Sequence, residues 1–224
     1  PPWPCTRRCS ADPLSAPPVD LDAQVRAADP DRWLSSRFVS DAGRRADLIA
    51  LYAFEAELLV IPTRVTQPLL AEMRYRWWAD QMDGVFANSP RIGHPVLEAL
   101  TGVVSRHRLD RAPLEALIEA HIGRVQGDPH DLDAFYVGPM QAAVRILAGS
   151  GHEATVVGAG RLWGQIQTGR FDEARALRGA ANAALKALPT AGFPAVAHAT
   201  LLDPAAPEPV KRLRLVWASL RGRV

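Results

Sequence analysis

The densest group of possible metal ligands in the chain lies in the stretch 127–133. Its side chains with oxygen or nitrogen donors are those of Asp128, His130, Asp131 and Asp133. Donors of this kind suit hard or borderline cations. However, Gly127 and Pro129 indicate a turn, and the spacing of the acidic residues matches no calcium-binding loop. We therefore expect a solvated loop here and no metal site.

Other residue types that could carry chemistry are few and isolated. Glu55 and Glu57 are two apart, so on a helix they point about 200° away from each other and cannot face one ligand. Cys5 and Cys9 predict neither a disulfide framework nor a zinc site. His94, next to a proline, is more typical of a structural role, and no Gly-x-Ser-x-Gly or phosphate-binding loop is present. The residues alone thus indicate no catalytic centre.

Composition limits the classes of partner. The 224 residues suit one domain with or without a tail, and 48% hydrophobic with 22% charged residues is typical of globular proteins. A net charge of +2 is too balanced to favour nucleic acid. We find no apolar run near the roughly 20 residues of a membrane span and no secretory signal, and a core without cysteine suits a reducing compartment.

The elements that must position any site are helices. We expect a Pro-rich disordered tail over 1–28 and a helical domain over 29–224, because no segment alternates as a strand would. Asp41 suits the N-cap of a helix that Pro62 should break or kink. Helical periodicity covers 42–61, 67–86, 95–107, 113–125, 132–147 (interrupted at Gly138), 153–167, 172–188, 193–202 and 210–220. Long helices joined by short turns predict an all-α bundle.

Several stretches of these helices resemble the squalene/phytoene synthase family. They are RADLIALYAF at 45–54, MRYRWWAD at 73–80 followed by GHPV at 93–96, LEALIE at 114–119, and GAGRLWG at 158–164. Their order and spacing extend the resemblance over about 31–202. It implies a single-domain isoprenoid-synthase-like bundle with a central cavity. The enzymes of this family join two prenyl diphosphates head to head, using Mg²⁺ held by acidic clusters on two facing helices.

The acidic clusters are missing from this sequence. The positions where the resemblance places their carboxylates hold Leu59, Val60, Thr63, Arg124, Phe171 and Arg175. Leucine and valine offer a cation no lone pair, so burial of an ion beside them would be costly. We therefore expect no catalytic residues, no metal and no cofactor, with Mg²⁺ bound only if the chain is an active synthase. We also expect Leu59, Val60 and Thr63 to face the interior or a neighbouring helix.

One branch of the family is more similar than the rest. The runs LYAFEAEL at 51–58 and RVTQP at 64–68 resemble the branch that includes the mitochondrial assembly factor of respiratory NADH:ubiquinone oxidoreductase and its alphaproteobacterial relatives. This resemblance implies a protein without catalysis that acts on a subunit or an assembly protein of that complex. An active head-to-head prenyl synthase and a lipid carrier remain the alternatives.

If the chain is not an enzyme, we expect an apolar cavity lined by Tyr52, Met73, Trp77 and Trp163, with a basic end at Arg212, Arg214 and Arg221. Such a hollow suits a lipid or isoprenoid, or an apolar helix of a membrane partner. Tryptophan at helical spacing is equally typical of plain core, and a basic last turn also suits the helix dipole. We expect the bacterial cytoplasm, with peripheral contact to the inner membrane, or the mitochondrial matrix if the source is eukaryotic.

Overall fold

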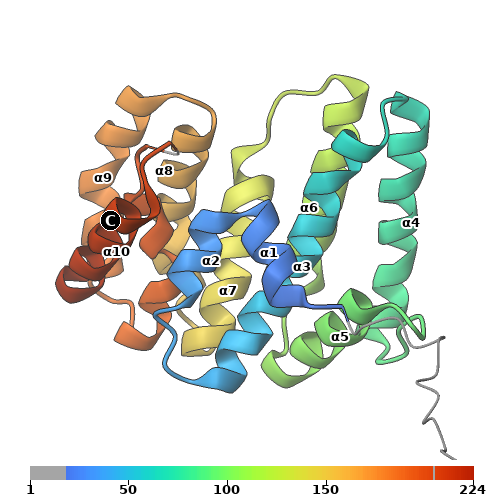
Figure 1. Cartoon of the computed structure of the whole chain (residues 1–224), viewed down its shortest axis with the longest axis horizontal. Helices are drawn as coiled ribbons and strands as arrows, with labels where there is room; N and C mark the ends of the chain where they lie inside the picture. Colours follow the sequence, from blue (N-terminus) through green and yellow to red (C-terminus); the bar gives the residue numbers. More distant parts are fainter. Residues whose placement is uncertain (1–18, 204) are drawn as a thin grey trace, which may run out of the picture.

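Helices make up all the regular structure of residues 19–203 and 205–224, the part of the chain that the computed structural model describes. Figure 1 shows them as one domain, in which long helices stand side by side with α4 at one end and α9 with α10 at the other. The prediction of an all-α bundle is confirmed. Over the described residues no helix is long and apolar enough to cross a membrane.

The elements follow one another with short connections. The α-helices are α1 (Leu21–Ala28), α2 (Pro30–Ser36), α3 (Ala42–Arg64), α4 (Pro68–Phe86), α5 (Pro95–His107), α6 (Arg111–Gln126), α7 (Gly138–Ala148), α8 (Val157–Gln167), α9 (Phe171–Leu185) and α10 (Glu208–Arg221). One π-helical turn, η1 (Asp133–Val137), and three 3-10 segments, η2 (Glu153–Val156), η3 (Thr190–Ala195) and η4 (Ala197–Thr200), complete them.

The domain begins before the boundary that we expected at residue 29. Residues 1–18 of the predicted tail lie outside the described residues, but Leu21–Ala28 forms α1. The Asp20 carboxylate caps this helix by accepting hydrogen bonds from two backbone N–H groups at 3.0 and 3.1 Å. Val25 is fully buried, and Gln24 donates a hydrogen bond of 2.6 Å to Glu57 of α3. The N-cap, the buried Val25 and the hydrogen bond to Glu57 together make residues 21–28 part of the folded domain.

Of the break or kink that we expected at Pro62, the break does not occur: helix α3 continues through Pro62 and ends at Arg64. A proline inside a helix leaves the carbonyl four residues earlier without its usual N–H donor. Here that carbonyl belongs to Leu58, and the hydroxyl of Tyr75 on α4 donates to it over 3.1 Å. The neighbouring helix α4 thus supplies the hydrogen bond that α3 itself cannot make. The periodicity of the sequence does not reveal this contact.

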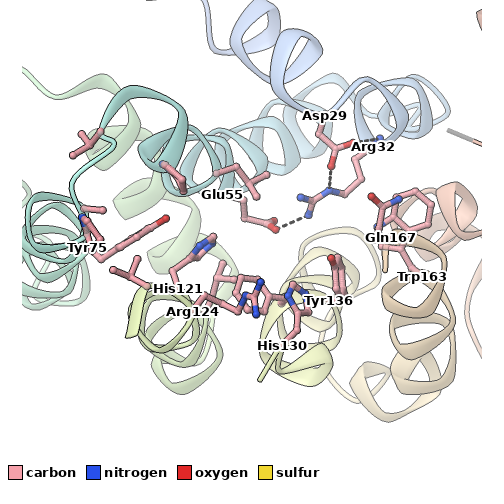
Figure 2. A pocket seen from close by; sticks show the side chains of 18 of the residues that line it. Asp29, Arg32, Glu55, Tyr75, His121, Arg124, His130, Tyr136, Trp163 and Gln167 are labelled. Carbon is pink, nitrogen blue, oxygen red and sulfur yellow. Dashed lines mark hydrogen bonds and ion pairs between the residues drawn. The ribbon is translucent and has the colours of Figure 1, made fainter. Parts of the chain in front are cut away.

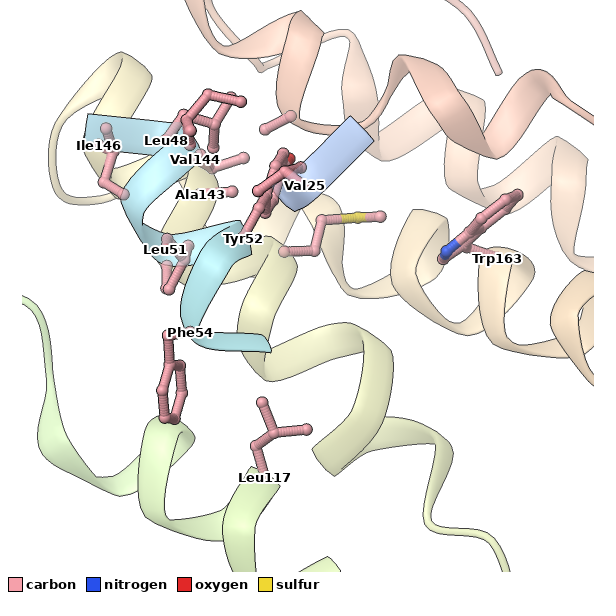
Figure 3. Packing of buried hydrophobic residues seen from close by; sticks show 14 of the residues in the cluster. Val25, Leu48, Leu51, Tyr52, Phe54, Leu117, Ala143, Val144, Ile146 and Trp163 are labelled. Atoms are coloured by element: carbon pink, nitrogen blue, oxygen red, sulfur yellow. The ribbon is translucent and has the colours of Figure 1, made fainter. Parts of the chain in front are cut away.

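The core is built around α3, in which all residues from 48 to 56 are buried, so that this part of the helix is surrounded by others. Leu48, Leu51, Phe54 and Leu58 are all fully buried. Figure 3 shows several of them packed toward α1, α6 and α7. Full burial of each such side chain stabilises the fold by roughly 1.5–3 kcal/mol, so these residues hold α3 rigidly at the centre.

Two other departures from the predicted elements have local causes. At the interruption expected at Gly138 and Pro139, the π turn η1 leads directly into α7. Pro139 lies in the first turn of α7, where the backbone N–H that proline lacks is not required. The helix expected over 193–202 consists of the 3-10 segments η3 and η4 instead. Pro194 lies within η3 and cannot donate to a regular helical ladder.

Candidate functional site

A pocket of about 540 Å³ lies at the centre of the domain (Figure 2). Apolar side chains supply much of its wall, among them Leu59, Pro62, Val65, Ala71, Leu117, Val125, Phe135 and Trp163. Its polar groups come from the junction of α1 and α2, from α3, and from the region of α6 and η1. An apolar hollow of this size with a few convergent polar groups has the character of a small-molecule site.

The inner polar end of the pocket is one arginine held between two carboxylates. Asp29 is the N-cap of α2, where its Oδ1 accepts from the Arg32 backbone N–H at 2.9 Å. The Arg32 side chain donates through Nε to Asp29 Oδ2 at 2.6 Å and through NH1 to Glu55 Oε2 at 2.5 Å. Three of the four carboxylate oxygens are therefore engaged with Arg32. Figure 2 shows this trio bridging α2 and α3.

The electrostatics of the trio are unequal. The charge and hydrogen bonds of Arg32 outweigh burial and hold the pKa of Asp29 below its ordinary value. Burial prevails at Glu55 and raises the pKa of that carboxyl, although Arg32 opposes the rise. Glu55 Oε1 is buried and has no hydrogen-bond partner among the described residues. This oxygen is the one strong acceptor that the trio leaves to a ligand.

Aromatic rings and two histidines form the opposite wall. His121 stacks on Tyr75 with ring centroids 5.0 Å apart and meets the edge of Phe135 at 4.7 Å. Burial, with the charge of His130, lowers the pKa of His121 to about 4, so its ring is neutral at pH 7. The pKa of His130 is lowered by burial and then by the charge of Arg124. Neutral imidazoles add polarity to this wall without adding positive charge.

The residues at the positions of the missing acidic clusters are dispersed. Leu59 and Arg124 line the pocket. Val60 lines a different groove, and Thr63 is exposed, with its hydroxyl bonded to the Val60 carbonyl at 2.8 Å. The prediction that Thr63 faces the interior or a neighbouring helix is therefore wrong, because in the last turn of α3 only Ile61 is buried. Phe171 and Arg175 are both exposed at the start of α9.

The four candidate cavity residues do not line one cavity. Trp163 lines the central pocket, while Tyr52 is buried behind it with the Arg32 guanidinium 4.9 Å from its ring. Met73 and Trp77 line a separate groove of about 730 Å³ between α3 and α4. The reason is helical phase: they lie on the face of α4 opposite to Tyr75, which lines the pocket. We call this second hollow the α3–α4 groove.

The pocket residues do not fit the magnesium cluster that the family implies. Leu59 offers no ligand, Arg124 brings a positive charge, and Arg32 occupies most of the carboxylate oxygens. Within the described ranges no group of three or more histidine, cysteine, aspartate or glutamate side chains is placed to hold a metal ion. In the loop considered above, Asp133 pairs with Arg161 at 2.6 Å and Asp131 accepts from backbone N–H groups.

Asp29, Arg32 and His121 are pocket residues that the sequence did not single out. The signal available was weak: an aspartate before a proline marks a helix start, and a glutamate within the apolar run 51–58 calls for a buried partner. Neither signal says which arginine is that partner, because Arg32 and Glu55 meet only through the packing of α2 on α3.

The part of the chain that matches a known family is the part that lines most of the central pocket. A model of the squalene/phytoene synthase family matches residues 25–136, half of the chain. This range supplies every lining residue of the central pocket except Trp163 and Gln167. Neither a curated protein nor a solved structure matches the chain. The chain belongs to the squalene/phytoene synthase family.

Proposed function

We propose that this family member does not catalyse magnesium-dependent prenyl transfer and acts instead in the assembly of respiratory NADH:ubiquinone oxidoreductase. The carrying observation is the Arg32 trio. Its two carboxylates are neutralised in part by an arginine, and Leu59 lies beside them where a synthase needs a carboxylate. A diphosphate would meet the buried, unpartnered Oε1 of Glu55, and the described residues of the pocket offer no carboxylate cluster that could hold Mg²⁺ between them. The resemblance of 51–58 and 64–68 to the assembly-factor branch supports the second half of the proposal.

The α3–α4 groove is our proposed surface for the assembly partner. Its apolar side chains include Val60, Ile61, Leu70, Met73 and Trp77, and Met73 is 60% exposed. Arg64, Arg74 and Arg91 lie along the same groove with Glu57. An apolar channel with charged margins suits an amphipathic helix of a partner. Glu57, which lies within the run 51–58 that resembles the assembly-factor branch, also ties α1 to α3 at this groove by accepting a hydrogen bond from Gln24.

The first test measures chemistry directly. Purified protein incubated with farnesyl or geranylgeranyl diphosphate and Mg²⁺ should release no diphosphate above a protein-free blank, because the pocket cannot assemble the metal cluster that aids departure of the leaving group. An active squalene synthase run in parallel shows that the assay works. Magnesium-dependent release that vanishes in an Arg32→Met or Leu59→Trp variant would establish the synthase alternative in place of our proposal.

The second test measures assembly in the source organism. Deleting the gene should reduce assembled NADH:ubiquinone oxidoreductase on native gels, and the intact chain should restore it. The Met73→Asp variant should restore at least about tenfold less of the assembled complex than the intact chain does. A charge placed in an apolar contact surface weakens binding of the partner by about 1.4 kcal/mol or more. The control is Phe171→Asp, an equally drastic change at an exposed position far from the groove. Full rescue by Met73→Asp, with normal protein levels, would exclude the groove as the working surface.

A further inference from the structure

A basic pocket lies between α9 and α10, at the end of the molecule opposite to α4 (Figure 1). It is a pocket of about 460 Å³ whose lining includes four arginines: Arg178, Arg214, Arg221 and Arg223. Over residues 19–203 and 205–224, no acidic side chain lines it. Arg178 comes from α9, Arg214 and Arg221 from α10, and Arg223 from the residues that follow. Tertiary packing therefore gathers positive charge from two helices at one place.

These arginines differ from many others of the described chain in their lack of ion pairs. Among the residues that the structure describes, none of the four forms an ion pair, and Nε of Arg178 is buried without an acceptor. Arg212 lies on the same helix, two residues before Arg214, but does not line the pocket and pairs with Glu208 at 2.6 Å. The side chain of Asn182 already has partners: its Nδ2 donates to the Val224 backbone oxygen at 2.9 Å, and its Oδ1 accepts from the Val224 N–H at 2.8 Å. Four guanidinium groups around one hollow repel one another unless an anion lies between them.

An apolar stripe runs along the outer face of α10 beside this pocket. Leu213, Trp217 and Leu220 are 70%, 54% and 77% exposed, and they follow the i, i+4, i+7 spacing of one helix face. The inner face is fixed to the domain by Leu215, which is fully buried, and by the ion pair of Lys211 with Asp31 at 2.7 Å. Figure 1 shows α10 at the edge of the molecule. The stripe is therefore presented outward on a helix that is itself anchored.

We propose that the arginine pocket binds the phosphate of an anionic phospholipid while the α10 stripe enters the headgroup region of the same membrane. Guanidinium groups match phosphate oxygens through paired N–H donors. An interfacial helix combines such cations with exposed leucine and tryptophan. The Arg221 guanidinium lies 4.0 Å from the Trp217 ring, which places a cation at the border of the two surfaces. The adjoining apolar stripe favours a lipid over free phosphate as the source of the anion.

Sedimentation with vesicles tests this inference on the full chain. The protein should bind vesicles of phosphatidylcholine mixed with phosphatidylglycerol and bind phosphatidylcholine alone weakly. Arg178→Gln and Arg214→Gln should each reduce binding to the mixed vesicles by about fivefold. Arg212→Gln removes the same unit of charge outside the pocket and should have little effect. Leu213→Ser with Leu220→Ser should also weaken binding, and inorganic phosphate at millimolar concentration should not compete.

Three results would overturn the inference. Equal binding to both vesicle types would show no recognition of the anionic lipid. An equal loss with Arg212→Gln and Arg178→Gln would show general attraction by net charge without a site. Strong binding of inorganic phosphate by a protein that ignores both vesicles would identify a free-anion site instead. None of these readouts depends on the assembly function, so either idea can fail alone.

Discussion

Arg32 sets the charge of the central pocket through a single side chain. It binds Asp29 and Glu55 together, and its guanidinium also lies over the ring of Tyr52. Removing one partner from a buried ion pair is costly because the other charge stays buried, whereas the pair itself contributes little net stability. The trio is thus better understood as a determinant of what the pocket accepts than as a stabilising device.

His121 makes the stability of the protein depend on pH. Its pKa of about 4 in the folded state lies below the ordinary 6.5, so between these values the unfolded chain binds more protons. Stability is therefore lost as the pH falls from about 6.5 toward 4. His121→Phe, which keeps the ring between Tyr75 and Phe135, should reduce the loss between pH 7 and pH 5 by about 1–2 kcal/mol. Urea unfolding followed by circular dichroism at both pH values measures it.

His198 remains in both proteins and supplies an internal control. Burial, then the charge of Arg32, lowers its pKa to about 3, so it adds a similar acid-induced loss to each. The expected result is therefore a shallower pH dependence in the variant and not a flat one. Parallel pH profiles for the two proteins would contradict the burial of a neutral His121.

At the scale of the element, α8 is the helix that depends most on glycine. A Cβ on Gly160 would lie 2.9 Å from the Cα of Val137 and 3.1 Å from the carbonyl oxygen of Tyr136. Gly160→Ala should therefore destabilise the fold by about 1–3 kcal/mol, because the backbone of η1 must move. The matched change Gly179→Ala on α9 meets nothing within 4 Å and should be neutral or stabilising by up to about 1 kcal/mol. Thermal melts of both variants give the comparison.

Equal melting temperatures for the two glycine variants would mean that α8 has room to shift.

The close approach itself was predictable, since the glycines of GAGRLWG at 158–164 indicate helix contact. Most helices were predictable for a similar reason: apolar periodicity and caps such as Asp41, which accepts from the Arg44 N–H at 2.8 Å, are local. The continuation of α3 past Pro62 was not, because its cause is Tyr75 on another helix.

At the scale of the whole molecule, the described surfaces are well separated. Helix α4, which forms one side of the α3–α4 groove, lies at the opposite end of the molecule from α9 and α10, which form the basic pocket (Figure 1). Partner capture at one end would leave the other end free to contact a membrane. The sequence predicted an aromatic cavity with a basic end but placed both on one hollow, because side-chain phase and tertiary distance are decided only when the helices pack.

The candidate site was predictable only where the family pattern reaches it. Leu59, Arg124 and Trp163 were singled out from the pattern and line the pocket. Its polar end was missed, because residues from 29 to 167 meet there and no local rule pairs Arg32 with Glu55. Contacts across such sequence distances depend on the packing of the whole bundle.

The hydrogen bond from Tyr75 to the Leu58 carbonyl also bears on the order of events when the chain folds. The turn before the last of α3 contains a carbonyl, that of Leu58, which its own helix cannot satisfy, so this part of the helix gains its full hydrogen bonding only when α4 is in place. The end of α3 and the middle of α4 therefore form and open as one cooperative unit. Amide hydrogens of the two segments should accordingly exchange with solvent at a common rate.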